Sequence, residues 1–273
     1  MYRITSRAPC GRKVFFMPET DTTPSRPRPQ LRDLIRAVHL LTRLPLPGGD
    51  ATRGAAAAWA WPLVGLIVGL GQVAAGLLAL WLGVSEAVAA GVAIAAGLLI
   101  TGGLHEDGLA DCADGFWGGM TPARRLEILK DSRIGAYGVL ALIVTIGFRW
   151  ALFASLLAIA PLTLLAAAMI SRAGIAVVMA RLPFAREGGL AAHVGRPPAW
   201  AVGLGGIIAG LGAIVFAGIG AGLAALGVAT VAILIVAALA RAKIGGQTGD
   251  VLGATQVVAE LAALATCAAF LST

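Results

Sequence analysis

The sequence predicts an all-α polytopic membrane protein, a bundle of about seven transmembrane helices preceded by one interfacial helix. Of its 273 residues, 58% are hydrophobic and 13% are charged, whereas about a quarter of the residues in soluble domains are charged. Several uncharged runs reach the roughly 20 apolar residues that a spanning helix needs. No soluble domain large enough to fold remains outside these runs, so the net charge of +7 does not indicate binding to nucleic acid.

The first 30 residues differ from the rest of the chain. Basic residues are scattered here among prolines and threonines without any apolar period, which is typical of a disordered tail. The segment also lacks a compact apolar core followed by a small-residue cleavage site, so we do not expect a removed leader. Residues 1–30 are therefore predicted to be a disordered basic tail, and residues 31–273 an integral membrane catalytic domain.

The first predicted helix begins near Leu31. Leu34, Val38 and Leu41 recur at helical spacing on one side, whereas Arg32, Asp33 and Arg36 fall on the other side. The segment is too short and too charged to cross a membrane, and Pro45 and Pro47 end it. We expect a helix that lies in the membrane interface.

Seven spans follow. They are predicted over residues 54–85, 87–104, 135–160 and 161–181, over 197–240 as two helices broken around 218–222, and over 251–271. Arg149 and Arg172 fall inside spans, where a charge costs at least about 2.5 kcal/mol and normally faces the bundle interior. A pair between Arg149 and Glu260 would explain Arg149 on structural grounds alone.

The basic residues predict the orientation. Ten of the 21 precede the first span, and cytoplasmic flanks are enriched in Lys and Arg, so we expect the N-terminus in the cytoplasm. With seven spans, the loops 105–133, 182–198 and 241–250 then lie on the same side. Cys10, Cys112 and Cys267 show neither metal-binding spacing nor a disulfide framework, and we interpret all three as small apolar fillers.

The acidic stretch Gly102–Gly119, GGLHEDGLADCADGFWGG, is the strongest functional signal. If it is helical, Asp107, Asp111 and Asp114 stand at i, i+4 and i+7 and share one face. Like charges placed in this way repel one another, which favours a divalent cation opposite them. Mg²⁺ fits best, because it commonly uses one or two carboxylates together with substrate phosphate oxygens. A solvated acidic loop is the alternative.

Three further polar segments carry groups suited to binding phosphate, because guanidinium groups, hydroxyls and glycine-rich turns all present donors. They are LKDSRIGAYG at 129–138 with Lys130, Asp131, Ser132 and Arg133, LPFAREGGLAAHVGR at 182–196 with Arg186 and His193, and GGQTGDVLG at 245–253 with Thr248 and Asp250. Each signal is weak when taken alone. Together they predict a phosphate-binding site on the side of the acidic stretch.

These motifs carry a resemblance to a known family. HEDGLADCADG at 105–115 and KDSRIGAYG at 130–138, with LLTRLPLP at 40–47, LPFAREGGL at 182–190 and GGQTGDVLGA at 245–254, occur in the order found in the cobalamin-5′-phosphate synthases, also called adenosylcobinamide-GDP ribazoletransferases. The chain resembles this family from about Leu31 to its end. The acidic motif is highly specific, and the others support it.

The resemblance implies a reaction, a cofactor and a location. Such enzymes join adenosylcobinamide-GDP to α-ribazole or its 5′-phosphate and release GMP, which is the nucleotide-loop assembly step of cobalamin biosynthesis, and they require Mg²⁺. The implied location is a prokaryotic inner membrane, with the active-site loops facing the cytoplasm. The expected partners are these substrates and membrane lipid.

We expect the following roles. Asp107, Asp111 and Asp114 would bind Mg²⁺, with Asp131 or Asp250 as further ligands. One carboxylate or His105 would be the general base. The remaining residues would bind substrate, with Arg172 stabilising transition-state charge because it is buried; these residues are Lys130, Ser132, Arg133, Arg172, Arg186, His193 and Thr248.

Two other classes of protein remain as alternatives to this interpretation. A CDP-alcohol phosphotransferase would have an Ala-Arg pair after the first Asp-Gly, but here Gly108 is followed by Leu109 and Ala110. A cation transporter would place carboxylates within the spans to form the ion path, whereas here they gather between spans on one side.

Overall fold

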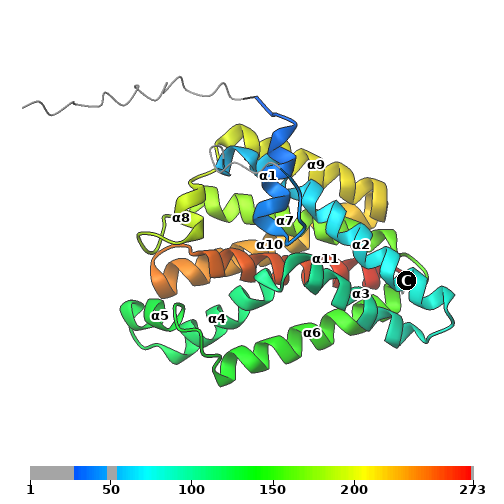
Figure 1. Ribbon diagram of the computed structural model, residues 1–273, viewed down its shortest axis with the longest axis horizontal. Helices are drawn as coiled ribbons and strands as arrows, with labels where there is room; N and C mark the ends of the chain where they lie inside the picture. The colour runs from blue at the N-terminus through cyan, green and yellow to red at the C-terminus, as the bar shows by residue number, and fades with distance from the viewer. Residues whose placement is uncertain (1–27, 48–53, 272–273) are drawn as a thin grey trace, which may run out of the picture.

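The computed structural model describes residues 28–47 and 54–271, and the regular structure of this part of the chain is helical, without a β-strand (Figure 1). One isolated parallel bridge joins Phe184 to Gln247. The helices are α1 (Arg32–Leu41), the 3₁₀ helix η1 (Gly54–Ala60), α2 (Trp61–Trp81), α3 (Glu86–Thr101), α4 (Leu104–Gly118), α5 (Pro122–Ile128), α6 (Ala136–Leu157), α7 (Leu162–Arg181), α8 (Leu190–Val194), α9 (Ala199–Ala217), α10 (Ile219–Ile244) and α11 (Gly249–Leu271).

The all-α membrane bundle is confirmed. Six helical segments of the described chain are long and apolar enough to cross a membrane, and the bent pair α3 and α4 makes a seventh if it counts as one span. The expected break near residue 218 is present, because α9 and α10 meet at Gly218, whose φ is +81°. Cys112 and Cys267 are buried and free, as expected of apolar fillers, whereas Cys10 lies outside the described residues.

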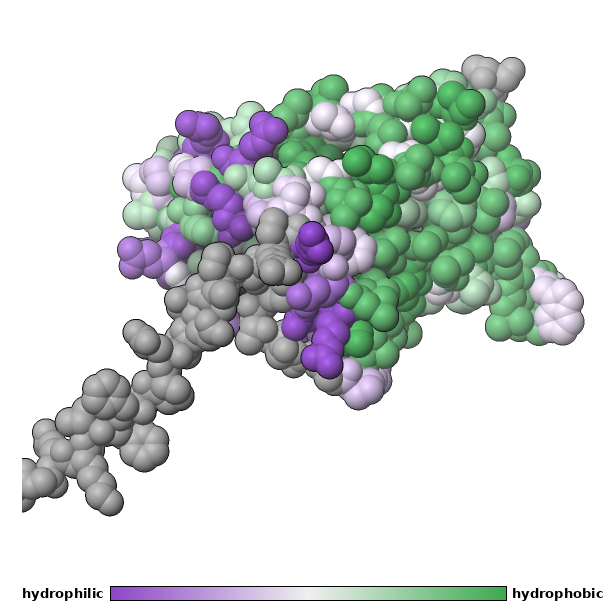
Figure 2. All heavy atoms as spheres, turned by 90° about the horizontal axis from the view of Figure 1, so that it is seen from above, coloured by the Kyte–Doolittle hydropathy of each residue, from purple (hydrophilic) through white to green (hydrophobic). Residues whose placement is uncertain are grey.

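Helix α7 forms the core of the bundle. Of the most apolar stretch of α7, 83% is buried inside the protein, against 17% for α6. On the outside, large apolar side chains such as Ile143 and Phe148 of α6 are exposed. Figure 2 shows apolar residues over most of the visible face and hydrophilic residues gathered at one end. The bundle therefore presents an apolar belt to lipid and collects its polar chemistry at one end.

Small residues let the helices approach closely, as is common in membrane bundles. A Cβ built on Gly65 of α2 would lie 2.7 Å from the carbonyl carbon of Ala168 and 2.9 Å from Cα of Met169, both on α7. A Cβ on Gly222 of α10 would lie 2.5 Å from the carbonyl oxygen of Ala213 on α9. Backbone atoms form both contacts, so neither can yield by a rotamer change.

Gly65→Ala is therefore expected to destabilise the protein by about 1–3 kcal/mol, the usual cost of overpacking a core. Gly91→Ala on α3 is the matched control, because a Cβ there meets nothing within 4 Å, and helix propensity favours alanine by up to about 1 kcal/mol. The midpoint of thermal unfolding in detergent should fall for Gly65→Ala and stay level or rise for Gly91→Ala. Equal midpoints for the two variants would contradict the close packing of α2 on α7.

The acidic stretch is helical, but it does not belong to a connecting loop. Gly102 and Gly103 adopt φ values of +69° and +66°, a left-handed conformation that glycine tolerates best. They end α3 and start α4 at an angle of 89°, and α4 then packs against α6 and α11. The first half of the expected loop over 105–133 is thus a helix of the bundle, whereas the cytoplasmic location of this segment stays a prediction.

Helix α1 forms as expected, but one of its residues faces the other way. Asp33 was expected on the polar side with Arg32 and Arg36, yet it is fully buried. Its carboxylate accepts a hydrogen bond from Nε1 of Trp59 at 3.0 Å and pairs with Arg36 at 3.0 Å. The reason is that η1 packs on this side of α1. The predicted disordered tail lies, for residues 1–27, outside the described part of the chain.

Candidate active site

Two glycines bring α4 and α11 together at the polar end of the bundle. A Cβ on Gly108 of α4 would lie 2.7 Å from the carbonyl oxygen of Asp250, and one on Gly253 of α11 would lie 3.0 Å from that of His105. Because no side chain separates the two backbones, Asp107 and Asp111 of α4 lie next to Asp250 at the start of α11. The helical spacing predicted this shared face for Asp107 and Asp111.

The carboxylates line two adjoining cavities. Asp107 and Asp250 line a cavity of about 210 Å³, and Asp107 and Asp111 line another of about 250 Å³. Asp107 belongs to both, so it stands on the wall that they share. Lys130 and Ser132 line the second cavity as well, which confirms that the segments around 107–111 and 130–132 meet in space.

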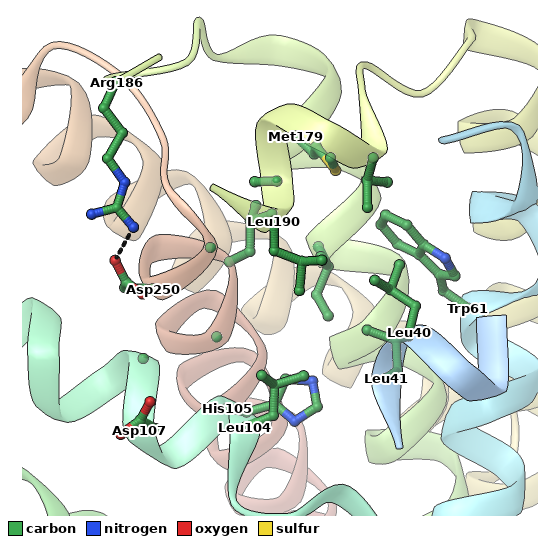
Figure 3. Close-up of a pocket in the computed structure, with 17 residues that line it drawn as sticks. Leu40, Leu41, Trp61, Leu104, His105, Asp107, Met179, Arg186, Leu190 and Asp250 are labelled. Atoms are coloured by element: carbon green, nitrogen blue, oxygen red, sulfur yellow. Dashed lines mark hydrogen bonds and ion pairs between the residues drawn. The ribbon is translucent and has the colours of Figure 1, made fainter. Parts of the chain in front are cut away.

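Two of these carboxylates are free to take an external ligand. Within the described residues, Asp107 and Asp111 accept no hydrogen bond and form no ion pair. Asp250, by contrast, accepts a hydrogen bond from the Thr248 hydroxyl at 3.0 Å and faces Nη2 of Arg186 at 3.4 Å (Figure 3). Nη1 of Arg186 is buried and has no hydrogen-bond partner in the part of the chain that the structure describes. A cation bound by the carboxylates and an anion bound by the guanidinium would give these groups the partners that they lack.

The donor set suits a cation that brings other ligands with it. No group of three His, Cys, Asp or Glu side chains in the described chain is arranged to hold a metal ion alone. Mg²⁺ commonly uses only one or two carboxylates and completes its shell with water and phosphate oxygens. Asp107 and Asp111 are the residues that could hold such an ion, with Asp250 nearby.

Asp114, expected as a third ligand, is engaged with the backbone. Its two carboxylate oxygens accept hydrogen bonds from the N–H groups of Gly135 at 2.7 Å and Gly138 at 2.9 Å. These groups stand at the start of α6, where a negative charge is favourable. The structure therefore gives Asp114 the task of fixing α6 against α4, and glycines are needed at 135 and 138 because a Cβ there would meet this carboxylate.

Asp131, the expected further ligand in the loop before α6, is paired with its neighbour. Arg133 donates from Nη2 to its carboxylate at 2.7 Å and from Nε at 3.1 Å and 3.2 Å. Hydrogen bonds from the Arg133 guanidinium lower the pKa of Asp131 to about 2. Asp131 still lines the second cavity together with Lys130 and Ser132, whereas Arg133 is turned to Asp131 and exposed to solvent.

Two more residues of the predicted site, His193 and Arg172, lie away from the two cavities. His193 on α8 is exposed and lines neither cavity. Arg172 is 2% exposed in the middle of α7, where its Nη1 donates to the carbonyl oxygen of Ala168 at 3.2 Å. The structure therefore does not bring Arg172 to the cavities with the aspartates.

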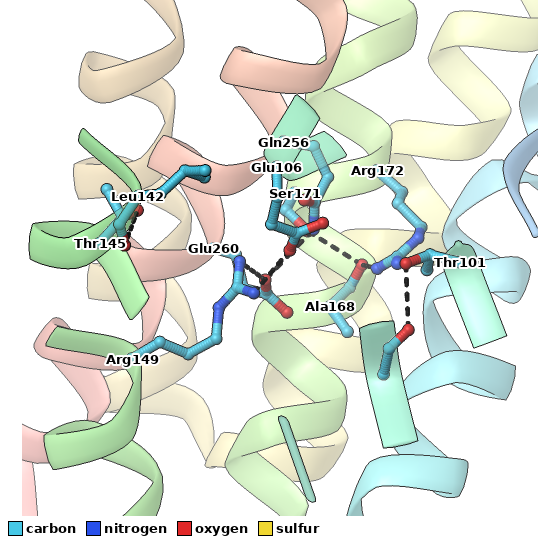
Figure 4. Close-up of polar contacts among 11 residues, drawn as sticks. Thr101, Glu106, Leu142, Thr145, Arg149, Ala168, Ser171, Arg172, Gln256 and Glu260 are labelled. Carbon is cyan, nitrogen blue, oxygen red and sulfur yellow. Dashed lines mark hydrogen bonds and ion pairs between the residues drawn. The ribbon is translucent and has the colours of Figure 1, made fainter. Parts of the chain in front are cut away.

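Arg172 belongs instead to a buried polar cluster deep in the bundle (Figure 4). Nη1 of Arg149 on α6 lies 2.6 Å from Glu106 of α4, and its Nη2 lies 3.0 Å from Glu260 of α11. The expected pair between Arg149 and Glu260 is confirmed, whereas the participation of Glu106 was not predicted. His105 connects the cluster with the site, because it lines both the 210 Å³ cavity and the small cavity of the cluster.

The fold and the site define a polytopic helical membrane protein with free carboxylates and an unsatisfied guanidinium at one end. Comparison with known proteins gives the family. The pattern of the cobalamin-5-phosphate synthase family matches residues 33–268, and the chain belongs to this family.

Curated relatives agree with this assignment. A protein of Bradyrhizobium diazoefficiens named adenosylcobinamide-GDP ribazoletransferase is 42% identical over 93% of this chain and 98% of its own length. Proteins of the same name from Azorhizobium caulinodans and Brucella canis are 42% and 43% identical over 86% and 85% of this chain, and over 94% of their own lengths. No solved structure matches the chain.

Proposed function

We propose that this chain is a Mg²⁺-dependent adenosylcobinamide-GDP ribazoletransferase, which joins adenosylcobinamide-GDP to α-ribazole or its 5′-phosphate and releases GMP. The observation that carries the proposal is the pair of carboxylates Asp107 and Asp111, which have no partner within the described chain, in a cavity that Lys130 and Ser132 also line. Phosphoryl transfer needs charge neutralisation and positioning more than covalent chemistry from the protein. In this cavity the two carboxylates can bind a cation that neutralises a pyrophosphate, and Lys130 and Ser132 can position it.

The chemical step is a displacement at phosphorus. A ribose hydroxyl of ribazole attacks the phosphorus attached to cobinamide, a new P–O bond forms, and the P–O bond to GMP breaks, so that GMP leaves with the electron pair. The hydroxyl proton passes to a base on the wall of the 210 Å³ cavity, where Asp107 and His105 are the candidates. Nε2 of His105 is buried without a partner in the described chain, which leaves it open to a substrate hydroxyl.

The residues around the phosphates divide the remaining work. Asp107 and Asp111 hold the cation, and Mg²⁺ bound there would neutralise charge on the pyrophosphate. Arg186, whose Nη1 has no partner among residues 28–47 and 54–271, supplies a fixed positive charge, and Lys130 adds a movable one. Thr248 keeps the Asp250 carboxylate in place through its hydroxyl, and Asp114 positions α6.

We also propose that the site faces the cytoplasm at a prokaryotic inner membrane. With the broken helix counted as one span, seven crossings place the C-terminal ends of α4 and α7 and the start of α11 on the side of the N-terminal segment. This segment contains ten of the 21 basic residues, as expected of a cytoplasmic flank.

The test is GMP release by the purified, detergent-solubilised protein supplied with adenosylcobinamide-GDP and α-ribazole. We expect GMP and the joined corrinoid product in equal amounts when Mg²⁺ is present. Chelation of the metal should reduce both to background, and restored Mg²⁺ should recover them, because two carboxylates and a pyrophosphate repel one another without a cation. A folded protein that releases no GMP would refute the proposed function, and GMP release that is indifferent to chelation would refute the role of the metal.

A further inference from the structure

The 210 Å³ cavity has two chemically different ends (Figure 3). Asp107, Arg186 and Asp250 mark one end. The other end is lined by apolar side chains of four helices, and these are Leu40, Leu41, Trp61, Met179 and Leu190. Among the described residues that line the cavity, none at this apolar end is Asp, Glu, Lys or Arg, so a charged group placed there would lose its hydration without gaining a partner from them.

The apolar end therefore disfavours the charged pyrophosphate of adenosylcobinamide-GDP and favours an uncharged, apolar part of α-ribazole. A cavity of about 210 Å³ is smaller than the roughly 300–1,000 Å³ of pockets that enclose drug-sized ligands, and it cannot enclose a corrin ring. A benzimidazole ring, the base of ribazole, is flat, neutral and aromatic, and it is small enough for this space. The indole of Trp61 and the thioether of Met179 are side chains that favour contact with aromatic rings.

We propose that the apolar end of this cavity binds the benzimidazole ring of ribazole and thereby sets the position of its ribose at Asp107 and Arg186. This inference rests on the proposed function and deepens it, because it assigns one substrate to each cavity. The second cavity, with Lys130, Ser132 and Asp111, is left for the pyrophosphate of adenosylcobinamide-GDP. The attacking hydroxyl and the phosphorus then meet at Asp107, which stands on the shared wall.

Leu190→Trp tests the assignment. Leu190 lines the cavity but is 55% exposed, so the fold can accept a larger side chain while the cavity loses space. We expect the Kd for α-ribazole, measured by equilibrium dialysis with the full chain in nanodiscs, to rise at least about tenfold, the scale on which apolar pockets discriminate by size. The KM for α-ribazole should rise in parallel, with the KM for adenosylcobinamide-GDP unchanged.

Two further variants separate a specific effect from general damage. Leu190→Asp adds charge instead of bulk and should weaken α-ribazole binding by a similar factor, because the ring would then desolvate a carboxylate. Leu211→Trp on α9 is the matched control, since Leu211 is 59% exposed and does not line the cavity. It should leave both KM values unchanged.

The outcomes also distinguish this inference from the proposed function. An unchanged Kd for α-ribazole in Leu190→Trp, or a rise in the KM for adenosylcobinamide-GDP instead, would overturn the cavity assignment even if GMP is still released. The same holds for a wild-type protein that binds no α-ribazole, because the cavity would then take another occupant, such as a lipid chain. Wild-type protein that binds α-ribazole but releases no GMP would refute the proposed function alone.

Discussion

Asp111→Asn is expected to lower kcat for GMP release at least about 10²-fold, the scale of losing one preorganised electrostatic contact in an active site. The change removes one of the two unpartnered carboxylates on the second cavity without altering shape. It breaks no internal hydrogen bond or ion pair of the described chain, and it removes a charge that Asp107, Asp250 and Asp114 repel. Thermal stability should therefore be equal to that of the wild type or slightly higher, so that activity and stability separate.

The control for this variant is Glu127→Gln on α5. Glu127 is also a carboxylate near the polar end, but its side chain is 66% exposed, pairs with Arg124 and lines neither cavity. Its kcat should stay within about twofold of the wild type, because a surface ion pair contributes little. Both variants should be assayed at saturating Mg²⁺ and substrates. Full activity in Asp111→Asn would remove Asp111 from the metal site.

Arg149→Met should cause the largest loss of stability among single changes at charged residues of the bundle interior. The change leaves Glu106 and Glu260 buried without their common partner, and breaking a buried pair in this way costs about 3–5 kcal/mol. Glu260→Gln should cost less, because Arg149 keeps Glu106 at 2.6 Å. The midpoints of thermal unfolding in detergent should therefore decrease from wild type to Glu260→Gln to Arg149→Met.

Two comparisons make this prediction specific. Arg124→Met removes an arginine from an exposed pair, in which the side chains are 64% and 66% exposed, and should cost less than about 1 kcal/mol. Adding Glu106→Gln and Glu260→Gln to Arg149→Met should recover part of the lost stability, since no unpaired buried charge then remains at these three positions. Equal midpoints for Arg149→Met and Arg124→Met would show that the buried cluster does not stabilise the bundle.

The sequence was sufficient to predict those features of the fold and the site that follow from one local pattern of residues. Uncharged runs marked the spans, and the glycines around 218 marked the break between α9 and α10. The spacing of Asp107 and Asp111 placed both on one face of a helix that does form. Arg149 at membrane depth required a partner. Glu260, the partner that was expected, is one of the two carboxylates that pair with it.

Other features depend on contacts between distant segments, which periodicity does not encode. Gly102 and Gly103 were recognised as turn formers, but the direction that α4 takes after them is set by packing on α6 and α11. Asp114 has the same spacing signal as Asp111, yet the N–H groups of Gly135 and Gly138 engage it. Glu106 stands one residue from Asp107 and thus about 100° around the helix. It therefore does not share the face on which the spacing places the aspartates, and the spacing does not predict its role.

The apolar end of the 210 Å³ cavity had no signal in the sequence at all. Leu40, Trp61 and Leu190 come from three different helices, and each is an ordinary residue in a sequence that is 58% hydrophobic. Only the fold shows that they surround one space. Motif reasoning found the charged residues of the site because these stand out from such a background.

The buried cluster also has a consequence for the order in which this protein is assembled. Glu106 of α4 depends on Arg149 of α6, and Arg149 depends on Glu260 of α11, the last helix of the chain. A carboxylate or guanidinium alone in lipid is costly, so Glu106 gains its buried partner only when α6 has been made, and Glu260 of α11 completes the cluster afterwards. The helix that carries the aspartates is thus tied through one guanidinium to the last helix of the chain, so the end of the chain helps to hold α4 in place.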